Sequence, residues 1–359
     1  MAQFDLEGRK IGIRQKRGNR KMKAVDMHCD TISELYKRIK EGQDGSLRRN
    51  NCHIDLMKLN KGDALLQNFA IFIHKGRTEN PLEEFLRLAD LYYNELGKNR
   101  DMIAPVFCWK DIEKNIAEGK ISALLTVEEG AVCKGNLAYL RDMYRLGVRM
   151  MTLTWNYPNE IGHPNVRAGN YEGRQIEGES VPFYKIADTE NGLTEQGVEI
   201  VTEMERIGMI IDVSHLSDKG FYDVLETTKK PFVASHSNAR AVCPWVRNLT
   251  DEMIRKLALR GGVIGLNFCP DFLTEVSKGE KNTGTIASIV EHAKYITNVG
   301  GIDCLGLGSD FDGIEGHEEL PDYSYLQELS EALCMAGFSN DQVEKIFYKN
   351  VLRLYKELL

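Results

Sequence analysis

Eight short apolar runs recur along the chain, each bounded by turn residues and followed by a helical or irregular segment. They span residues 24–27, 65–73, 121–127, 148–154, 209–213, 232–234, 263–267 and 304–308. The runs are almost continuously hydrophobic, as is typical of parallel strands that are buried on both faces. Eight such strands alternating with helices predict an α/β fold of the TIM type, which is a closed (β/α)8 barrel.

The connecting segments agree with this prediction. Residues 194–207 begin with a capping threonine, carry Val198, Val201 and Met204 on one predicted helix face, and are followed by Gly208. Residues 251–259 and 340–358 also show a helical pattern. No linker rich in Pro, Gly or Ser divides the 359 residues, so we expect a single barrel domain over residues 23–359.

The composition limits the kinds of partner that the chain can have. Hydrophobic residues make up 42% and charged residues 28%, and no apolar run approaches the roughly 18 residues that would span a bilayer. The formal net charge is -7. Binding to a phosphate backbone needs an excess of Lys and Arg, so we expect neither a nucleic-acid partner nor a membrane.

Residues 1–22 form a basic extension that we expect to be poorly ordered. The segment from Arg9 to Lys23 holds eight basic residues and no acidic one, and it lacks the apolar core of a secretory signal. A contact with an acidic partner is the alternative. Eight cysteines without a C-x-x-C pair indicate reduced, mostly buried thiols and a cytoplasmic location.

Polar side chains suited to metal binding follow five of the eight runs. His28 and Asp30 follow the first run and point to the same side, because side chains alternate along a strand. The others are Glu128 and Glu129 after the third run, His215 after the fifth, His236 after the sixth, and Asp310 and Asp312 after the eighth. Each alone is compatible with a solvated strand end, a buried histidine or a turn. Barrel enzymes place their working residues at the carboxyl ends of the strands, so together these residues predict a metal site.

The number of ligands favours two ions over one. Three imidazoles and at least two carboxylates exceed the three protein ligands of a single catalytic zinc. A bridging carboxylate would use them all, so we expect two divalent ions, with Zn2+ as the favoured metal. Water bridged by two ions becomes hydroxide near neutral pH, which is the nucleophile of a hydrolase. A further carboxylate is then needed to carry the proton to the leaving amine.

Six motifs occur in the order found in one known family. They are H-C-D-T, V-E-E-G, I-I-D-V-S-H-L-S, A-S-H-S-N, R-N-L-T-D and G-S-D-F-D-G. Over residues 25–353 the chain resembles the zinc-dependent membrane (renal) dipeptidase family, and within it the soluble microbial branch. The resemblance implies a barrel of the metal-dependent hydrolase kind with a binuclear zinc centre.

The resemblance also assigns the metal ligands by position. Glu128, and not Glu129, would bridge the two ions, because the glutamate of the family motif falls directly after the position of Val127. The remaining ligands implied are His28 and Asp30 for one ion, and His215 and His236 for the other.

Roles for catalysis and substrate binding follow in the same way. Asp310, the first acid of S-D-F-D-G, would be the catalytic proton shuttle, and Arg247 would receive the terminal carboxylate of the substrate, for which a guanidinium fork is well suited. A surface salt bridge is the alternative for Arg247. Better-known members of the family read T-L-T-H after the fourth strand, whereas this chain has Trp155 in place of the histidine. We therefore expect Trp155 and Asn156 to shape the substrate pocket, under a long polar segment that overhangs the mouth of the barrel.

Together these inferences predict a cytoplasmic, metal-dependent dipeptidase that hydrolyses small dipeptides through a metal-bridged hydroxide. The resemblance implies tolerance of a D-residue at the C-terminal side of the substrate, and a homodimer stays open. Two alternatives are another amidohydrolase-type hydrolase, such as a lactonase or phosphotriesterase, and a metal-binding barrel without catalysis. The former commonly have H-x-H on the first strand and a lysine after the fourth; this chain has H-x-D and no lysine at residues 152–156. The lone G-L-G at residues 306–308 is weak support for a phosphate-binding barrel.

Overall fold

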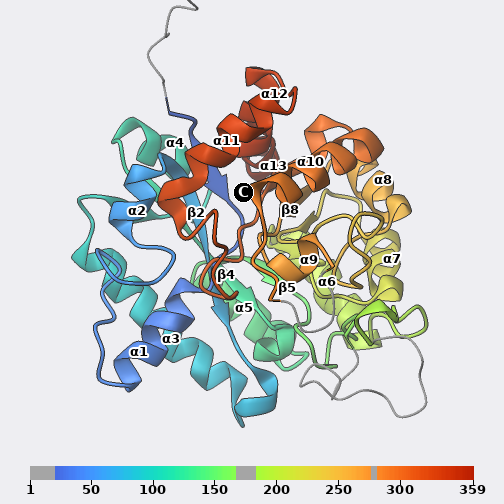
Figure 1. Ribbon diagram of the computed structural model, residues 1–359. Helices are drawn as coiled ribbons and strands as arrows, with labels where there is room; N and C mark the ends of the chain where they lie inside the picture. Colours follow the sequence, from blue (N-terminus) through green and yellow to red (C-terminus); the bar gives the residue numbers. More distant parts are fainter. Residues whose placement is uncertain (1–20, 167–182, 276–280) are drawn as a thin grey trace, which may run out of the picture.

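The computed structural model describes residues 21–166, 183–275 and 281–359 of the chain (Figure 1). The basic extension therefore lies almost entirely outside the described residues. So does the middle of the long segment expected to overhang the barrel.

The strands form a closed parallel barrel, as the sequence predicts. Pairing runs β1, β2, β4, β5, β6, β7, β8, β9 and back to β1. All eight strands predicted from the apolar runs are present, and every pairing between them is parallel. Their bounds are β1 Ala24–Asp26, β2 Ala64–Phe72, β4 Ile121–Glu128, β5 Val148–Thr152, β6 Ile210–Asp212, β7 Val233–Ala234, β8 Val263–Leu266 and β9 Leu305–Leu307.

A ninth strand, β3 (Ile103–Pro105), was not predicted. It pairs with the first three residues of β4, whereas β5 pairs with β4 from Leu125 onward. The strand has three residues, of which only Ile103 is buried, and it ends in a proline. A segment this short has no hydrophobic pattern that distinguishes it from a loop.

Helices surround the strands in Figure 1. Their bounds are α1 Thr31–Lys40, α2 Leu56–Lys61, α3 Pro81–Lys98, α4 Trp109–Ala117, α5 Leu137–Arg145, α6 Glu195–Ile207, α7 Asp218–Thr227, α8 Asp251–Leu259, α9 Pro270–Leu273, α10 Ile286–Gly300, α11 Leu326–Met335, α12 Asn340–Glu344 and α13 Asn350–Leu358. The three helices predicted from the sequence are confirmed, although a π-helical turn at Lys345–Lys349 joins α12 to α13.

The predicted buried face of α6 was wrong in one position. Thr194 caps the helix by accepting a hydrogen bond from the Gly197 N–H, and Gly208 ends it in a left-handed conformation with φ of 82°. Val201 and Met204 are buried, but Val198 is 41% exposed. The spacing of hydrophobic residues does not fix the rotation of the helix to within one position, and packing against α5 and α7 sets it.

One end of the barrel is closed by the C-terminal helix. Seven barrel strands each contribute a side chain to a buried cluster with α13 (Val25, Leu66, Leu124, Met150, Ile210, Val233 and Val263, with Val351, Leu354 and Tyr355). These strand residues lie in the N-terminal half or at the middle of their strands. The carboxyl ends of the strands are therefore left free to carry a site.

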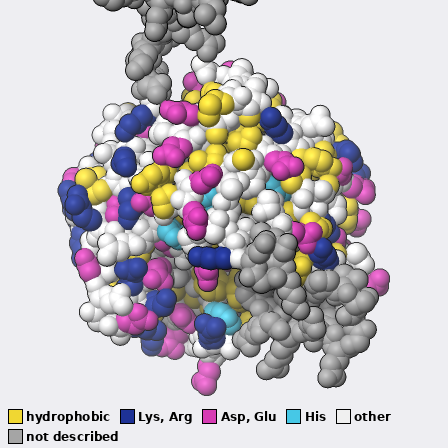
Figure 2. Space-filling view, in the orientation of Figure 1, with side chains coloured by type: hydrophobic (Ala, Val, Ile, Leu, Met, Phe, Trp, Pro, Cys, Tyr) yellow, Lys and Arg dark blue, Asp and Glu magenta, His cyan; other side chains and the backbone are white. Residues whose placement is uncertain are grey.

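Other global expectations can be compared with the structure. The eight cysteines are free, and five of them are buried. Within the described ranges, no helix has both the length and the apolarity needed to cross a bilayer. Acidic and basic side chains are interspersed over the face seen in Figure 2.

Candidate metal centre

The five predicted metal ligands and the predicted proton shuttle, Asp310, converge at the carboxyl ends of the barrel strands. Glu128 is the last residue of β4, and the others follow their strands within a few residues. They are His28 and Asp30 after β1, His215 after β6, His236 after β7 and Asp310 after β9. All are buried, with exposed fractions of 0% to 9%. Residues far apart in the sequence are thus brought to one point by closure of the barrel.

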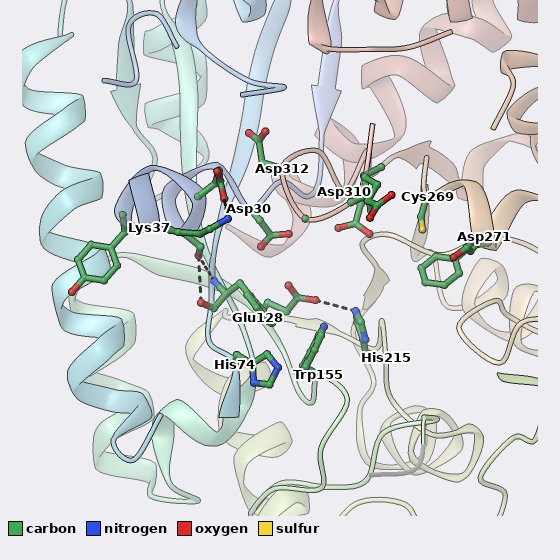
Figure 3. Close-up of a pocket in the computed structure, with 18 of the residues that line it drawn as sticks. Asp30, Lys37, His74, Glu128, Trp155, His215, Cys269, Asp271, Asp310 and Asp312 are labelled. Carbon is green, nitrogen blue, oxygen red and sulfur yellow. Dashed lines mark hydrogen bonds and ion pairs between the residues drawn. The ribbon is translucent and has the colours of Figure 1, made fainter. Parts of the chain in front are cut away.

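Glu128 lies between two sets of ligand atoms. Its Oε2 atom is 3.4 Å from His28 Nε2, which is also 3.5 Å from Asp30 Oδ2 and 3.9 Å from Asp310 Oδ1. Its Oε1 atom is 3.0 Å from His215 Nε2 and 3.5 Å from His236 Nε2. Figure 3 shows Glu128 pointing toward His215, with Asp30 and Asp310 above Glu128 in the view.

Backbone strain accompanies this arrangement. His215 and Asp310 are both in the left-handed region, with φ of 69° and 62°. Such conformations cost on the order of 1–3 kcal/mol for a residue with a side chain, and they cluster at functional sites. The left-handed backbone conformation turns both side chains toward the site at the ends of their strands.

Burial of so many ionisable groups shifts their pKa values. Burial raises the pKa of the Glu128 carboxyl to about 8 and that of Asp310 to about 6. It lowers the pKa values of His215 and His236 well below the ordinary value, so both imidazoles are neutral. For His28, burial acts to lower the pKa, but the charges of Glu128 and Asp30 outweigh it and raise the pKa well above its usual range.

The arrangement of atoms fits divalent cations. Among the described residues, His28 Nε2 and Asp30 Oδ1 are buried polar atoms without a hydrogen-bond partner. His215 Nδ1 lies 2.9 Å from Asn156 Oδ1, which can only accept, so Nδ1 carries the proton and Nε2 presents a lone pair toward Glu128. A lone pair and a carboxylate oxygen 3.0 Å apart need a proton or a cation between them. Two groups of three ligands meet within 4.8 Å, His28 with Glu128 and His236, and His28 with Asp30 and Asp310.

The neighbouring acids have other functions. Glu129 has φ of 105° and turns away from the centre, so that it accepts hydrogen bonds from the Ala131 N–H, the Trp155 N–H and the Asn159 side chain. Asp312 accepts from the Thr31 hydroxyl and the His53 N–H, each at 2.6 Å. Both therefore stabilise loops around the site.

The three predicted substrate-binding residues occupy different places. Trp155 is half-buried and lines the cavity in front of the centre. Asn156 is 2% exposed and does not line that cavity; it holds the His215 ring, so its placement favours an orienting role. Arg247 is also buried, and donates to the carbonyl of His236 and the hydroxyl of Ser237 at 3.1 and 3.5 Å.

The cavity has a volume of about 820 Å3 and an aromatic wall beside the metal ligands. The Trp155 ring lies 4.9 Å from the rings of both Phe72 and His74, and 6.3 Å from that of His215 (centroid distances). His74 is not among the site residues predicted from the sequence. It directly follows the second apolar run, so the strand-end rule that found the other histidines could have found it as well.

Comparison with known proteins identifies a family and relatives that match most of the chain. The membrane dipeptidase family (peptidase family M19) matches residues 14–358. An uncharacterized protein from the pqqA 5' region of Klebsiella pneumoniae is 35% identical over 69% of this chain and 86% of its own length. An uncharacterized dipeptidase of Schizosaccharomyces pombe is 32% identical over 85% of this chain and 72% of its own length.

Two solved structures share the fold. One, described as dipeptidase AC, a metallopeptidase of family M19, has a TM-score of 0.80 and 26% identity, covering 94% of this chain and 99% of its own. The other is a metallopeptidase of Rhodobacter sphaeroides with a bound phosphinate mimic of the dipeptide L-Ala-D-Ala. It has a TM-score of 0.80 and 24% identity, and covers 94% of this chain and all of its own.

Gly313 gives a test of the ligand set. A Cβ atom at this position would lie 2.1 Å from Asp30 Oδ2 and 2.8 Å from Asp310 Oδ1, so Gly313→Ala must displace the Asp30 carboxylate. We expect at least about a tenfold loss of zinc affinity, the scale seen when the surroundings of a metal ligand are disturbed. Chelator competition measures it. Gly316→Ala is the control, because its nearest neighbour would be His53 Nε2 at 3.9 Å. Unchanged zinc binding by Gly313→Ala would contradict the assignment of Asp30.

Proposed function

We propose, from the premise that the chain belongs to the membrane dipeptidase family, peptidase family M19, that it is a binuclear metallo-dipeptidase that hydrolyses small dipeptides. Membership makes the chain a hydrolase of the metallo-dipeptidase class. The observation that carries the binuclear proposal is the position of Glu128, whose two oxygens face different sets of ligands. This is the arrangement required of a bridging carboxylate.

Five of the converging residues are proposed as ligands for two ions. We assign His28 and Asp30 to one ion, His215 and His236 to the other, and Glu128 to both. Zinc fits imidazole nitrogen and carboxylate oxygen ligands of this kind. Divalent ions bound here supply an acidified water and a Lewis acid close to the scissile carbonyl.

The chain's own residues then handle the proton and the substrate. We assign Asp310 as the group that takes a proton from the attacking water and delivers it to the leaving amine. Its Oδ2 atom accepts a hydrogen bond from the Asn267 side chain at 2.9 Å, which orients the carboxyl, and burial holds its pKa at about 6. A carboxyl group held in a fixed place beside the metal ligands can first accept a proton and then donate it.

Arg247 is proposed to attract the terminal carboxylate of the dipeptide. Its guanidinium is buried beside His236, where a positive charge is little screened by water. The related metallopeptidase of Rhodobacter sphaeroides was solved with a mimic of L-Ala-D-Ala. This supports the proposal that a D-residue is tolerated at the C-terminal side.

The aromatic wall is proposed to bind a substrate side chain. Phe72, His74 and Trp155 form an apolar surface beside His215 on one side of the cavity. The cavity, at about 820 Å3, is larger than a dipeptide of two alanines requires. We therefore expect dipeptides with a large apolar side chain to be preferred over those with small ones.

The proposed function is tested by metal analysis together with a panel of L,L- and L,D-dipeptides. We expect about two zinc ions per chain, hydrolysis of dipeptides in both series, and loss of activity on chelation that is reversed by added zinc. The panel should include a lactone and a phosphotriester, which are substrates of other amidohydrolase-type barrels. Absence of stoichiometric metal after zinc reconstitution would remove the proposal, and two bound ions without any turnover would favour a binding protein.

The proton-carrying role is tested with Asp310→Asn. We expect it to keep its bound ions but to lose about 10²- to 10⁴-fold in kcat, the usual contribution of general acid–base catalysis. Asp271→Asn is the matched control, because Asp271 lines the same cavity but is exposed. Loss of metal together with activity in Asp310→Asn would make Asp310 a ligand instead, and unchanged rates would remove its role.

The aromatic wall is tested with Trp155→Ala. Removing the indole takes away apolar contact worth about 1–2 kcal/mol, at roughly 25 cal/mol per Å2 of buried surface. We expect kcat/KM to fall about 5- to 30-fold for dipeptides with an aromatic side chain, and much less for Ala-D-Ala. The measurement is the ratio of kcat/KM between the two substrates. An equal loss for both would show that Trp155 does not select the side chain.

A further inference from the structure

Asp212 and Ser235 lie beneath the metal centre and have no role in the proposed reaction. Asp212 is the last residue of β6, and Ser235 comes directly after β7 and before His236. Both side chains are completely buried. A buried carboxylate next to a metal ligand is costly unless several donors satisfy it, so its hydrogen bonds indicate what it does.

Four donors converge on the Asp212 carboxylate. The Oδ1 atom accepts from the backbone N–H groups of Ser214 and Ser235, at 3.0 and 2.8 Å. The Oδ2 atom accepts from the hydroxyls of Ser235 and Thr152, each at 2.6 Å. Ser235 therefore donates its single hydroxyl proton to Asp212.

This use of the proton decides the bond between Ser235 and His236. Ser235 Oγ also lies 2.7 Å from His236 Nδ1. With its own proton given to Asp212, the oxygen can only accept at this contact, so His236 Nδ1 must carry the proton. The Nε2 atom of His236 is then unprotonated, and its lone pair faces Glu128 Oε1 and His215 Nε2.

We propose that Asp212 and Ser235 form a relay that fixes His236 in the tautomer able to bind a metal ion. The relay runs from the Asp212 carboxylate through the Ser235 hydroxyl to the imidazole. Both are positioning residues, which act through His236 and touch neither substrate nor ion. The inference rests on the metal centre of the proposed function, but the tautomer itself is a property of the metal-free protein.

The chain contains a matched control for this relay. Asp26 at the end of β1 accepts from the Ser309 hydroxyl at 2.6 Å and from its N–H at 2.8 Å, as Asp212 does from Ser235. Ser309 is also buried and also precedes a site residue. Its hydroxyl, however, contacts the backbone carbonyl of His28 at 3.2 Å and no imidazole. Loss of the Ser309 hydroxyl should lower the stability of the fold without changing the tautomer of any histidine.

Asp212→Asn distinguishes the relay from a packing role. The amide that replaces the carboxylate has the same shape, but its NH2 group donates to Ser235 Oγ. The hydroxyl proton of Ser235 then turns to His236 Nδ1, and the proton of His236 moves to Nε2, where a metal ion would bind. Replacing one carboxylate oxygen by an NH2 group therefore moves the imidazole proton of His236 from Nδ1 to Nε2. The same replacement of an orienting carboxylate by an amide gives the wrong histidine tautomer in a catalytic triad.

The experiment measures zinc affinity by chelator competition in wild-type protein and three variants. We expect Ser235→Ala to bind zinc about 10- to 100-fold more weakly, Asp212→Asn to be weaker still, and Ser309→Ala to stay within about threefold of wild type. Thermal unfolding of the metal-free proteins reports their folding. Equal losses in Ser235→Ala and Ser309→Ala would overturn the relay.

A second measurement remains informative if a variant folds poorly. Long-range 1H–15N correlation spectra of the metal-free wild-type protein report histidine tautomers, with the His236 signals identified by their absence in His236→Gln. We expect Nδ1–H in the wild type, and Nε2–H in Asp212→Asn. An Nε2–H tautomer in the wild type would overturn the proposal. If the tautomer is as expected but wild-type protein binds no zinc, the proposed function fails and the relay does not.

Discussion

The rest of the site depends on burial of the Glu128 carboxylate between imidazoles carried by opposite parts of the barrel. Its two oxygens are 3.4 Å from His28 after β1 and 3.0 Å from His215 after β6. Taking a carboxylate out of water costs several kcal/mol unless nearby positive charge and hydrogen bonds offset it, and this cost appears as the pKa of about 8. Two divalent cations would reverse the balance, because they favour the ionised form of every acid around them. The centre is thus built to be completed by cations.

Two buried aspartates tie the ligand-bearing strands together below this centre. Asp26 links β1 to the Ser309 segment after β9, and Asp212 links β6 to the Ser235 segment after β7. In each case the aspartate binds a serine whose next residue belongs to the site, either Asp310 or His236. The strands also approach very closely here: a Cβ on Gly265 or Gly308 would lie 1.9 or 1.8 Å from the Ser235 carbonyl oxygen. Close backbone contact and buried carboxylates together leave the ligands little freedom, as pre-organised metal sites require.

The sequence predicted the barrel and the convergence of its ligands because both depend on local patterns. Continuous apolar runs mark buried parallel strands, and in a barrel all their carboxyl ends lie on one face. His28, Asp30, Glu128, His215, His236 and Asp310 could therefore be predicted to meet. What the sequence could not give were properties that depend on packing between segments. These are the rotation of α6 that exposes Val198, the unpredicted strand β3, and the direction of the Asn156 side chain toward the His215 ring.

The tautomer of His236 is a further property that could not be predicted from the sequence. The motif around Asp212 could be read as a strand end followed by a ligand, but nothing local places Asp212 beside a serine 23 positions later. The contact forms because β6 pairs with β7. The hydrogen bonds that Asp212 accepts then determine which nitrogen of His236 is unprotonated. A metal centre made of residues from separate strands therefore depends on a buried layer whose side chains never meet an ion. In this chain the layer includes Asp26 and Asp212 with the hydroxyl side chains that they bind, and through Ser235 it orients the His236 ring.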